Sequence, residues 1–217
     1  MKNSFQNERI IIFGASRGLG AAVTSQLQGA DLLLISRSIS KSVKPLSIAL
    51  DLDLSREVDQ EKAIHEASRF APHRIFYFSG GGPYGHFADK NWRDHEWALN
   101  VNFLFPAKLM HFFLKTPSPQ LKQMIFTGSA IAESQPDKNA ASYSTSKHAL
   151  RALLENIWSE GLQIDLRLFS PGYMDTDLLP KKSRPRELEK ILDPTEVAQT
   201  FCDWALDPKA SLHKILK

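Results

Sequence analysis

Short apolar runs recur along the chain and alternate with longer segments whose apolar positions repeat at helical spacing. The runs are almost continuously apolar, which is typical of strands buried on both faces of a parallel sheet. They cover residues Arg9–Phe13, Asp31–Ser36, Leu46–Leu52, Arg74–Ser79, Gln123–Gly128 and Gln163–Phe169. The helix-like segments are Gly18–Gln28, Ser55–Phe70, Trp92–Leu114, Ser144–Gly161 and Pro194–Leu206. This alternation predicts an α/β fold with a doubly wound parallel sheet and helices on both faces.

The chain shows no boundary that would divide it into separate domains. None of its 217 residues form a linker rich in Pro, Gly or Ser, and a single α/β core grows to this size. The last predicted helix has a clear beginning, since Asp193 is a suitable N-cap and Pro194 suits the first helical position. After Asp207 at most a short edge strand fits. We therefore expect a single domain over residues 1–217.

Composition narrows the classes of function. A formal net charge of +3 argues against the dense basic face that non-specific nucleic-acid binding needs. The single cysteine, Cys202, has no partner for an internal disulfide, which favours a reducing compartment. The polar first residues lead into an apolar run too short for a signal peptide or a membrane span, and the histidines lack metal-ligand spacing. We expect a cytoplasmic protein without nucleic-acid, membrane or metal partners.

A glycine-rich turn follows the first predicted strand and opens the first predicted helix. The segment Gly14-Ala15-Ser16-Arg17-Gly18-Leu19-Gly20 holds three glycines, where one suffices for an ordinary strand–helix turn. Glycines let the backbone approach a pyrophosphate closely, and the free N–H groups of the helix N-terminus attract its negative charge. The turn predicts a dinucleotide site with contacts from Gly14, Ser16, Arg17, Gly18, Leu19 and Gly20.

The end of the second predicted strand indicates which dinucleotide is bound. An NAD site usually carries an acidic residue there, about 20 residues after the turn, which binds the ribose 2′-OH. This chain has Ser36-Arg37-Ser38 instead, and a guanidinium is suited to a 2′-phosphate. Arg17 is a second candidate for phosphate contact, although each arginine alone is equally consistent with a solvated surface charge. We expect NADP(H) to be preferred over NAD(H).

Tyr143 and Lys147 lie four residues apart and would share one face of a helix. A free phenol has a pKa of about 10, too high for proton exchange near neutral pH. A cation roughly 4 Å away favours the phenolate by about 4 kcal/mol at an effective dielectric near 20, enough to bring that pKa to about 7. Because this spacing occurs by chance on many helices, the pair must be interpreted together with the motifs around it.

The ordered motifs resemble the short-chain dehydrogenase/reductase family, and the match covers most of the chain, from the glycine turn to Pro171-Gly172. That family combines a Gly-x-x-x-Gly-x-Gly turn with an active site of Asn, Ser, Tyr and Lys. The matching positions here are Asn102, Ser129, Tyr143 and Lys147, with Asn100 as the alternative to Asn102. The resemblance implies a Rossmann fold in which Tyr143 exchanges a proton with the substrate and Ser129 orients the carbonyl. Lys147 would lower the Tyr143 pKa and bind the nicotinamide ribose, and Asn102 would help hold a water.

The resemblance implies further cofactor contacts. The segment from Ser170 to Thr176 is similar to the family's Pro-Gly…Thr segment beside the nicotinamide, which points to Pro171, Gly172 and Thr176. Ser79-Gly80-Gly81-Gly82 stands where the family has Asn-Asn-Ala-Gly. Gly80 and Gly81 still permit close backbone approach to the ribose, but the missing asparagines put local rigidity in doubt. For the adenine contact we favour Asp53 over Asp51, although either aspartate is consistent with a simple helix cap.

The motifs together predict an NADP(H)-dependent carbonyl reductase or alcohol dehydrogenase that acts on a small molecule. The alternative is a nucleotide-binding sensor or scaffold with little catalytic activity. The basic segment Lys181–Arg186 is interpreted as a solvated loop, with contact to an acidic substrate or to the cofactor phosphates as the alternative. Phe87, Trp92 and Trp97 are assigned to the core, with a position in the wall of a pocket as the alternative.

We also expect a homodimer through the helices Trp92–Leu114 and Ser144–Gly161, because the short C-terminus disfavours the edge-strand contact of the family's tetramers. The second of these helices has an apolar face, which is equally consistent with packing on the sheet. That face consists of Leu150, Leu153, Leu154, Ile157 and Trp158.

Overall fold

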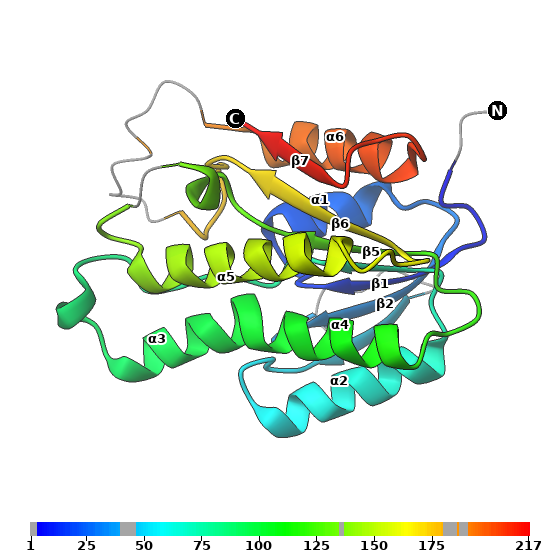
Figure 1. Cartoon of the computed structure of the whole chain (residues 1–217), viewed down its shortest axis with the longest axis horizontal. Helices are drawn as coiled ribbons and strands as arrows, with labels where there is room; N and C mark the ends of the chain where they lie inside the picture. Colours follow the sequence, from blue (N-terminus) through cyan, green and yellow to red (C-terminus); the bar gives the residue numbers. More distant parts are fainter. Residues whose placement is uncertain (1–3, 40–46, 135–136, 180–185, 187–190) are drawn as a thin grey trace.

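The computed structural model describes residues 4–39, 47–134, 137–179, 186 and 191–217. Within these residues seven parallel strands form one sheet in the order β3-β2-β1-β4-β5-β6-β7 (Figure 1). The strands are β1 (Arg9–Phe13), β2 (Asp31–Ser36), β3 (Ser47–Asp51), β4 (Arg74–Tyr77), β5 (Gln123–Thr127), β6 (Asp165–Pro171) and β7 (His213–Leu216). The predicted doubly wound parallel sheet is confirmed, and β7 is the short edge strand expected after Asp207.

Helices cover both faces of the sheet. α1 (Gly18–Gln26) and α6 (Pro194–Leu206) pack on one face, and α2 (Glu57–Phe70), α4 (Phe105–Lys115) and α5 (Ala141–Trp158) pack on the other (Figure 1). Successive side chains of β1 alternate between these two cores, since Ile10 and Ile12 join the first and Ile11 and Phe13 the second. Burial on both faces therefore explains the continuous apolar runs.

The segment predicted as one helix over Trp92–Leu114 contains a wide π-helical turn. α3 (Trp92–Leu99) continues through Asn100–Leu104 into α4, and the Phe105 N–H donates to the carbonyl of Asn100, five residues back. Pro106 follows directly. Proline has no N–H and its ring crowds the carbonyl four residues earlier, so a wider turn relieves the clash. Pro106 was the sequence signal for this interruption.

Two predicted boundaries move in ways that affect the candidate site. α5 begins at Ala141 rather than Ser144, so Tyr143 and Lys147 both lie within the helix. β6 covers Asp165–Pro171 rather than Gln163–Phe169, because Leu168 to Pro171 pair with β7 where the ladder to β5 ends. The start of the predicted third strand, Leu46, lies outside the described residues.

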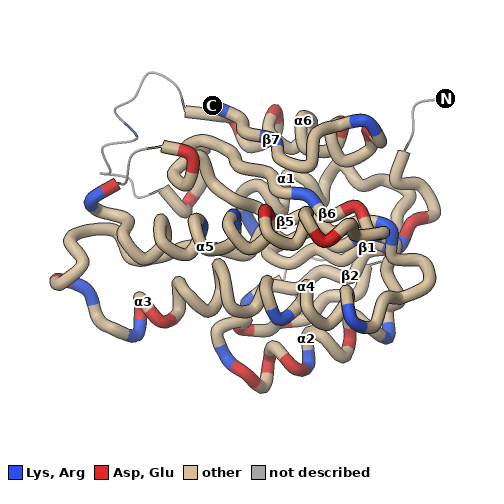
Figure 2. The backbone as a smooth tube through the Cα atoms, viewed as in Figure 1, with Lys and Arg blue, Asp and Glu red and all other residues tan. Residues whose placement is uncertain are grey.

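Positive and negative residues alternate along the chain (Figure 2). Both signs occur along α2 and near α3. In the part of the chain that the structure describes, the helices are too short or too polar to cross a membrane. The same residues contain no group of His, Cys, Asp and Glu side chains arranged to hold a metal ion.

Candidate active site

A cavity of about 780 Å³ opens at the carboxyl ends of the strands, where the sheet order reverses between β1 and β4. It is bounded by the glycine turn, the ends of β2 and β5, the loop after β4, the start of α5 and the segment after β6. The predicted site residues that line it are Gly14, Ser16, Arg17, Gly18, Leu19, Gly20, Arg37, Asp53, Gly80, Ser129, Tyr143, Lys147, Pro171, Gly172 and Thr176. Gly81 and Asn102 are not part of its described lining, and they are hydrogen-bonded to each other.

The glycine turn has the close packing that requires glycine. Gly14 has φ +84°, and a Cβ built there would lie 2.6 Å from the Ser79 backbone nitrogen. A Cβ at Gly20 would lie 2.1 Å from the Gly14 carbonyl oxygen. The backbone at the N-terminus of α1 therefore borders the cavity, and within the described residues Arg17 provides no side-chain cap for it. Uncapped N–H groups facing a cavity fit the phosphates of a dinucleotide.

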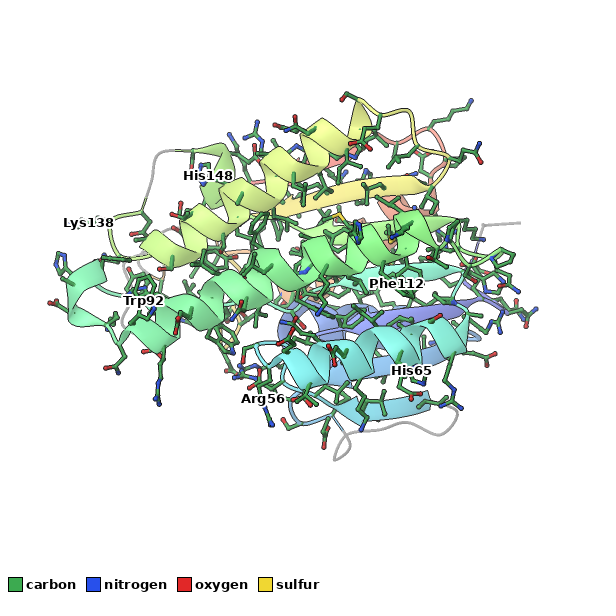
Figure 3. All side chains as sticks on the ribbon, turned by 60° about the horizontal axis from the view of Figure 1, so that its bottom comes forward. Arg56, His65, Trp92, Phe112, Lys138 and His148 are labelled. Carbon is green, nitrogen blue, oxygen red and sulfur yellow. The ribbon has the colours of Figure 1, made fainter. Side chains whose placement is uncertain are left out.

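Arg37 lines the part of the cavity next to the glycine turn, which we call the nucleotide half. Its guanidinium carbon lies 5.2 Å from the centre of the Trp97 ring, and both side chains line the cavity. Trp97 packs against the hydrophobic core and also lines the cavity, so both interpretations hold for it. The assignment to the core was wrong for Phe87 and Trp92, whose exposed fractions are 53% and 61%. Figure 3 shows Trp92 at the beginning of α3, at the outer end of the molecule.

The two aspartates near the end of β3 differ in position. Asp53 lines the cavity, and its Oδ1 accepts hydrogen bonds from the Ser55 N–H at 3.0 Å and the Ser55 hydroxyl at 2.8 Å. Asp51 accepts a hydrogen bond from the Ile39 N–H and is not among the described lining residues. The position of Asp53 favours it for an adenine contact, and its bonds to Ser55 also give it a local structural role.

Ser129, Tyr143 and Lys147 meet at one wall of the cavity. The Lys147 ammonium donates to the Thr127 carbonyl at 2.7 Å and lies 5.6 Å from the centre of the Tyr143 ring. Burial lowers the pKa of Lys147 to about 7. Burial also raises the pKa of Tyr143 above its ordinary value of 10, while the Ser129 hydroxyl acts in the opposite direction. The net shift of the Tyr143 pKa is upward, and the lowering expected from Lys147 stays a prediction.

Asn102 braces the loop after β4. Its side-chain amide donates to the carbonyls of Gly81 and Ala98, both at 2.6 Å, and its Oδ1 accepts from the Gly81 N–H at 3.1 Å. These bonds replace the rigidity that the missing loop asparagines would have supplied. Both amide hydrogens are occupied, so the side chain has none left to donate to a water. The amide of Asn102 therefore does not donate to the water that we expected it to help hold.

Several lining residues were missed from the sequence because they lie in loops. Tyr84 and Tyr173 each follow a Pro or Gly of a lining segment, which was the available signal, whereas nothing marked Asp137. In the basic segment, residues 181–185 lie outside the described residues. Arg186 donates to Asp175 at 2.7 Å and to backbone carbonyls, so it stabilises the segment after β6.

The sheet order, the uncapped glycine turn and the buried lysine beside a tyrosine define a dinucleotide-binding α/β protein of the Rossmann class. The sequence model of the short chain dehydrogenase family matches residues 8–187. The chain therefore belongs to the short-chain dehydrogenase/reductase family.

Curated relatives share less than a quarter of their residues with this chain. A PIGF/3-ketodihydrosphingosine reductase fusion protein of Schizosaccharomyces pombe is 23% identical over 95% of this chain and 47% of its own length. A 3-ketodihydrosphingosine reductase of Yarrowia lipolytica is 23% identical over 88% of this chain and 59% of its own length. This chain thus spans about half the length of these two. A cyclic-di-GMP-binding biofilm dispersal mediator protein of Escherichia coli is 24% identical, and 96% of this chain and 93% of that protein are covered.

Solved structures share the fold. A short chain dehydrogenase from Burkholderia cenocepacia in complex with NADP has a TM-score of 0.81 at 20% identity and covers 99% of this chain and 98% of its own. A Burkholderia phymatum short chain dehydrogenase/reductase in complex with NAD has a TM-score of 0.79 at 20% identity, covering 97% and 90%. Proteins of this fold thus bind either dinucleotide.

Proposed function

We propose that the protein is an NADP(H)-dependent oxidoreductase that interconverts a carbonyl and an alcohol. The observation that carries this proposal is the position of Ser129, Tyr143 and Lys147 on one wall of the cavity that the glycine turn also borders. Its volume of about 780 Å³ suits a dinucleotide together with a small substrate. Membership of the family and the NADP complex of a similar structure support the same reaction class.

A bound nicotinamide would supply the hydride for the carbonyl carbon, which leaves the carbonyl electron pair on oxygen. Tyr143 then gives its phenolic proton to that oxygen, so that the products are the alcohol and NADP⁺. The raised pKa of Tyr143 keeps the phenol protonated near neutral pH, as a proton donor must be. The Ser129 hydroxyl orients the carbonyl oxygen. Lys147, with a pKa of about 7, exchanges protons readily and returns one to Tyr143.

Preference for NADP(H) is part of this proposal. Arg37 occupies the position at the end of β2 where an NAD site usually has an acidic residue, and it lines the cavity. A 2′-phosphate would draw its guanidinium from the Trp97 ring into a charge-assisted hydrogen bond. Calorimetric titration with NADPH and NADH should show tighter binding of NADPH. Equal affinities would contradict the preference while leaving the reaction class in place.

Replacing Tyr143 tests the reaction. Tyr143→Phe keeps the ring and removes the acidic proton, so kcat for a carbonyl substrate should fall roughly 100- to 10,000-fold. The dissociation constant of NADPH, measured by calorimetry, should change little. Thr145→Ala, at an exposed position on the same helix, is the matched control and should retain the wild-type rate. A Tyr143→Phe protein as fast as wild type would refute the assignment.

A nucleotide-binding sensor is the second candidate. The Escherichia coli relative named for cyclic-di-GMP binding favours it, because that protein and this one match over nearly their full lengths. A sensor would bind NADPH or cyclic-di-GMP without reducing a broad panel of carbonyl compounds. Turnover of any compound in that panel, lost in Tyr143→Phe, would decide for the enzyme.

A further inference from the structure

The cavity contains a group of loop residues around Tyr143 that the proposed cofactor contacts do not use. Tyr84, Asp137 and Tyr173 line it, and the Tyr173 hydroxyl donates to Asp137 Oδ2 at 3.4 Å. Burial raises the pKa of Tyr173, and the Asp137 charge and the phenols of Tyr84 and Tyr143 act in the same direction. All four side chains line the same cavity. We call these four residues the substrate end, because Tyr143 would protonate the substrate there.

Asp137 retains the capacity to bind a partner. Its Oδ1 accepts from the Asn139 N–H at 2.8 Å, whereas the bond from Tyr173 to Oδ2 is long. Across the described part of the chain, Lys and Arg side chains form their ion pairs with other carboxylates and not with Asp137. A carboxylate oxygen has room for more than one donor, so Oδ2 is available to a bound molecule.

The described charges around the cavity are divided between its two halves. Arg17 and Arg37 lie in the nucleotide half, and the Lys147 ammonium is bonded to the Thr127 carbonyl. The segments after η4 (Ala130–Glu133) and β6 contribute two carboxylates, Asp137 and Asp177. Among the described residues, these two carboxylates would repel a negatively charged substrate and attract a positively charged one.

We propose that the substrate carries a protonated amine close to its reacting carbonyl, and that Asp137 binds this ammonium as a specificity-determining residue. A carboxylate flanked by aromatic rings suits an ammonium group, which gains charge-assisted hydrogen bonds and cation–π contacts. The phenol rings of Tyr84 and Tyr173 supply that aromatic surface. The substrate class is therefore an amino ketone, or an amino alcohol in the reverse direction. This proposal rests on the function proposed above and specifies its substrate.

Three small ketones of similar size provide the test. Aminoacetone is cationic, hydroxyacetone is neutral and pyruvate is anionic, and their reduction is followed by the consumption of NADPH. We expect kcat/KM to decrease in that order, with aminoacetone at least roughly 10-fold above hydroxyacetone. Asp137→Asn keeps the acceptor for the Asn139 N–H and removes the charge. It should lower kcat/KM for aminoacetone roughly 10- to 100-fold, mainly through KM, and leave hydroxyacetone nearly unaffected.

Binding provides a readout that does not depend on turnover. Saturation with NADP⁺ blocks reduction, so calorimetry then measures the dissociation constant of aminoacetone alone, and Asp137→Asn should raise it by the same factor. Asp177→Asn removes an equal charge from the same cavity and should have a clearly smaller effect. Equal losses in the two variants, or equal losses for aminoacetone and hydroxyacetone, would overturn the role of Asp137. If NADPH binds but none of the ketones is reduced, the proposed function itself fails.

Discussion

Lys147 is a cation that the fold places almost entirely out of water, with an exposed fraction of 2%. Its described hydrogen bond is to the Thr127 carbonyl, a neutral acceptor, and burial disfavours the charged form. The same lysine that would return protons to Tyr143 is therefore a source of instability at low pH.

The stability of the protein should increase with pH because of Lys147. Its pKa is about 7 in the folded chain and 10.5 when solvated, so the unfolded state binds more protons between these values. The free energy of unfolding should therefore rise with pH in this window, with a contribution of at most about 1.4 kcal/mol per pH unit. Urea unfolding of wild type and Lys147→Met at several pH values measures that contribution as the difference in slope. Lys138→Met, at an exposed lysine, is the control, and an unchanged slope in Lys147→Met would contradict the prediction.

Asn102 should be required for folding as well as for any catalytic role. In Asn102→Asp, a carboxylate would face the carbonyls of Gly81 and Ala98, which now receive hydrogen bonds from the amide. We expect the free energy of unfolding to fall by about 2–4 kcal/mol, close to the loss in Asn102→Ala. Urea unfolding checks this, and an Asp variant as stable as wild type would show that the brace is dispensable.

Among the elements, those formed by local patterns agree best with the sequence. The apolar runs and the cap of α6 are local signals, and Asp193 accepts hydrogen bonds from the N–H groups of Thr195 and Glu196 as expected. The end of β6 was misjudged because it depends on β7, over 40 residues away, where His213 bonds the buried Ser170 hydroxyl. Asp137 could not be found because its loop position depends on no periodic pattern. Cavity-lining residues that belong to the family's motifs were predictable, whereas Tyr84 and Asp137, in loops outside those motifs, were not.

The glycine turn between β1 and α1 allows a matched pair of substitutions. Gly14 and Gly161 both have positive φ, +84° and +70°, but only Gly14 is tightly packed against described neighbours. Gly161→Ala should cost about 1 kcal/mol of unfolding free energy through backbone strain alone. Gly14→Ala adds a clash with the Ser79 backbone, so it should cost about 3 kcal/mol or more and weaken NADPH binding. Urea unfolding and calorimetry distinguish the two, and equal losses would show that packing in the turn is unimportant.

At the scale of the whole molecule, the expected homodimer remains a proposal. The structure limits which residues can form its interface. Leu150 and Leu154 are fully buried in the chain's own core and cannot form the contact. Leu104, between α3 and α4, has an exposed fraction of 51%. We therefore propose a dimer over the outer face of α3 and α4.

Light scattering coupled to size-exclusion chromatography tests this dimer. Wild type should have the mass of two chains, and Leu104→Lys should shift it toward one chain, because burying a charge in an apolar contact is unfavourable. Lys209→Ala, at an exposed position after α6 and away from this face, is the control for surface substitution in general. A monomeric wild type would contradict the proposal.

The fluorescence of Trp97 can report on the nucleotide half of the cavity. Indole fluorescence responds to nearby charge, and the Arg37 guanidinium carbon lies 5.2 Å from the ring. Trp204 is buried in the core and Trp92 lies at the exposed outer end of α3, so their surroundings should change less when a dinucleotide enters. Binding would then be followed through the emission of the unlabelled protein, and the signal would be assigned by its loss in Trp97→Phe.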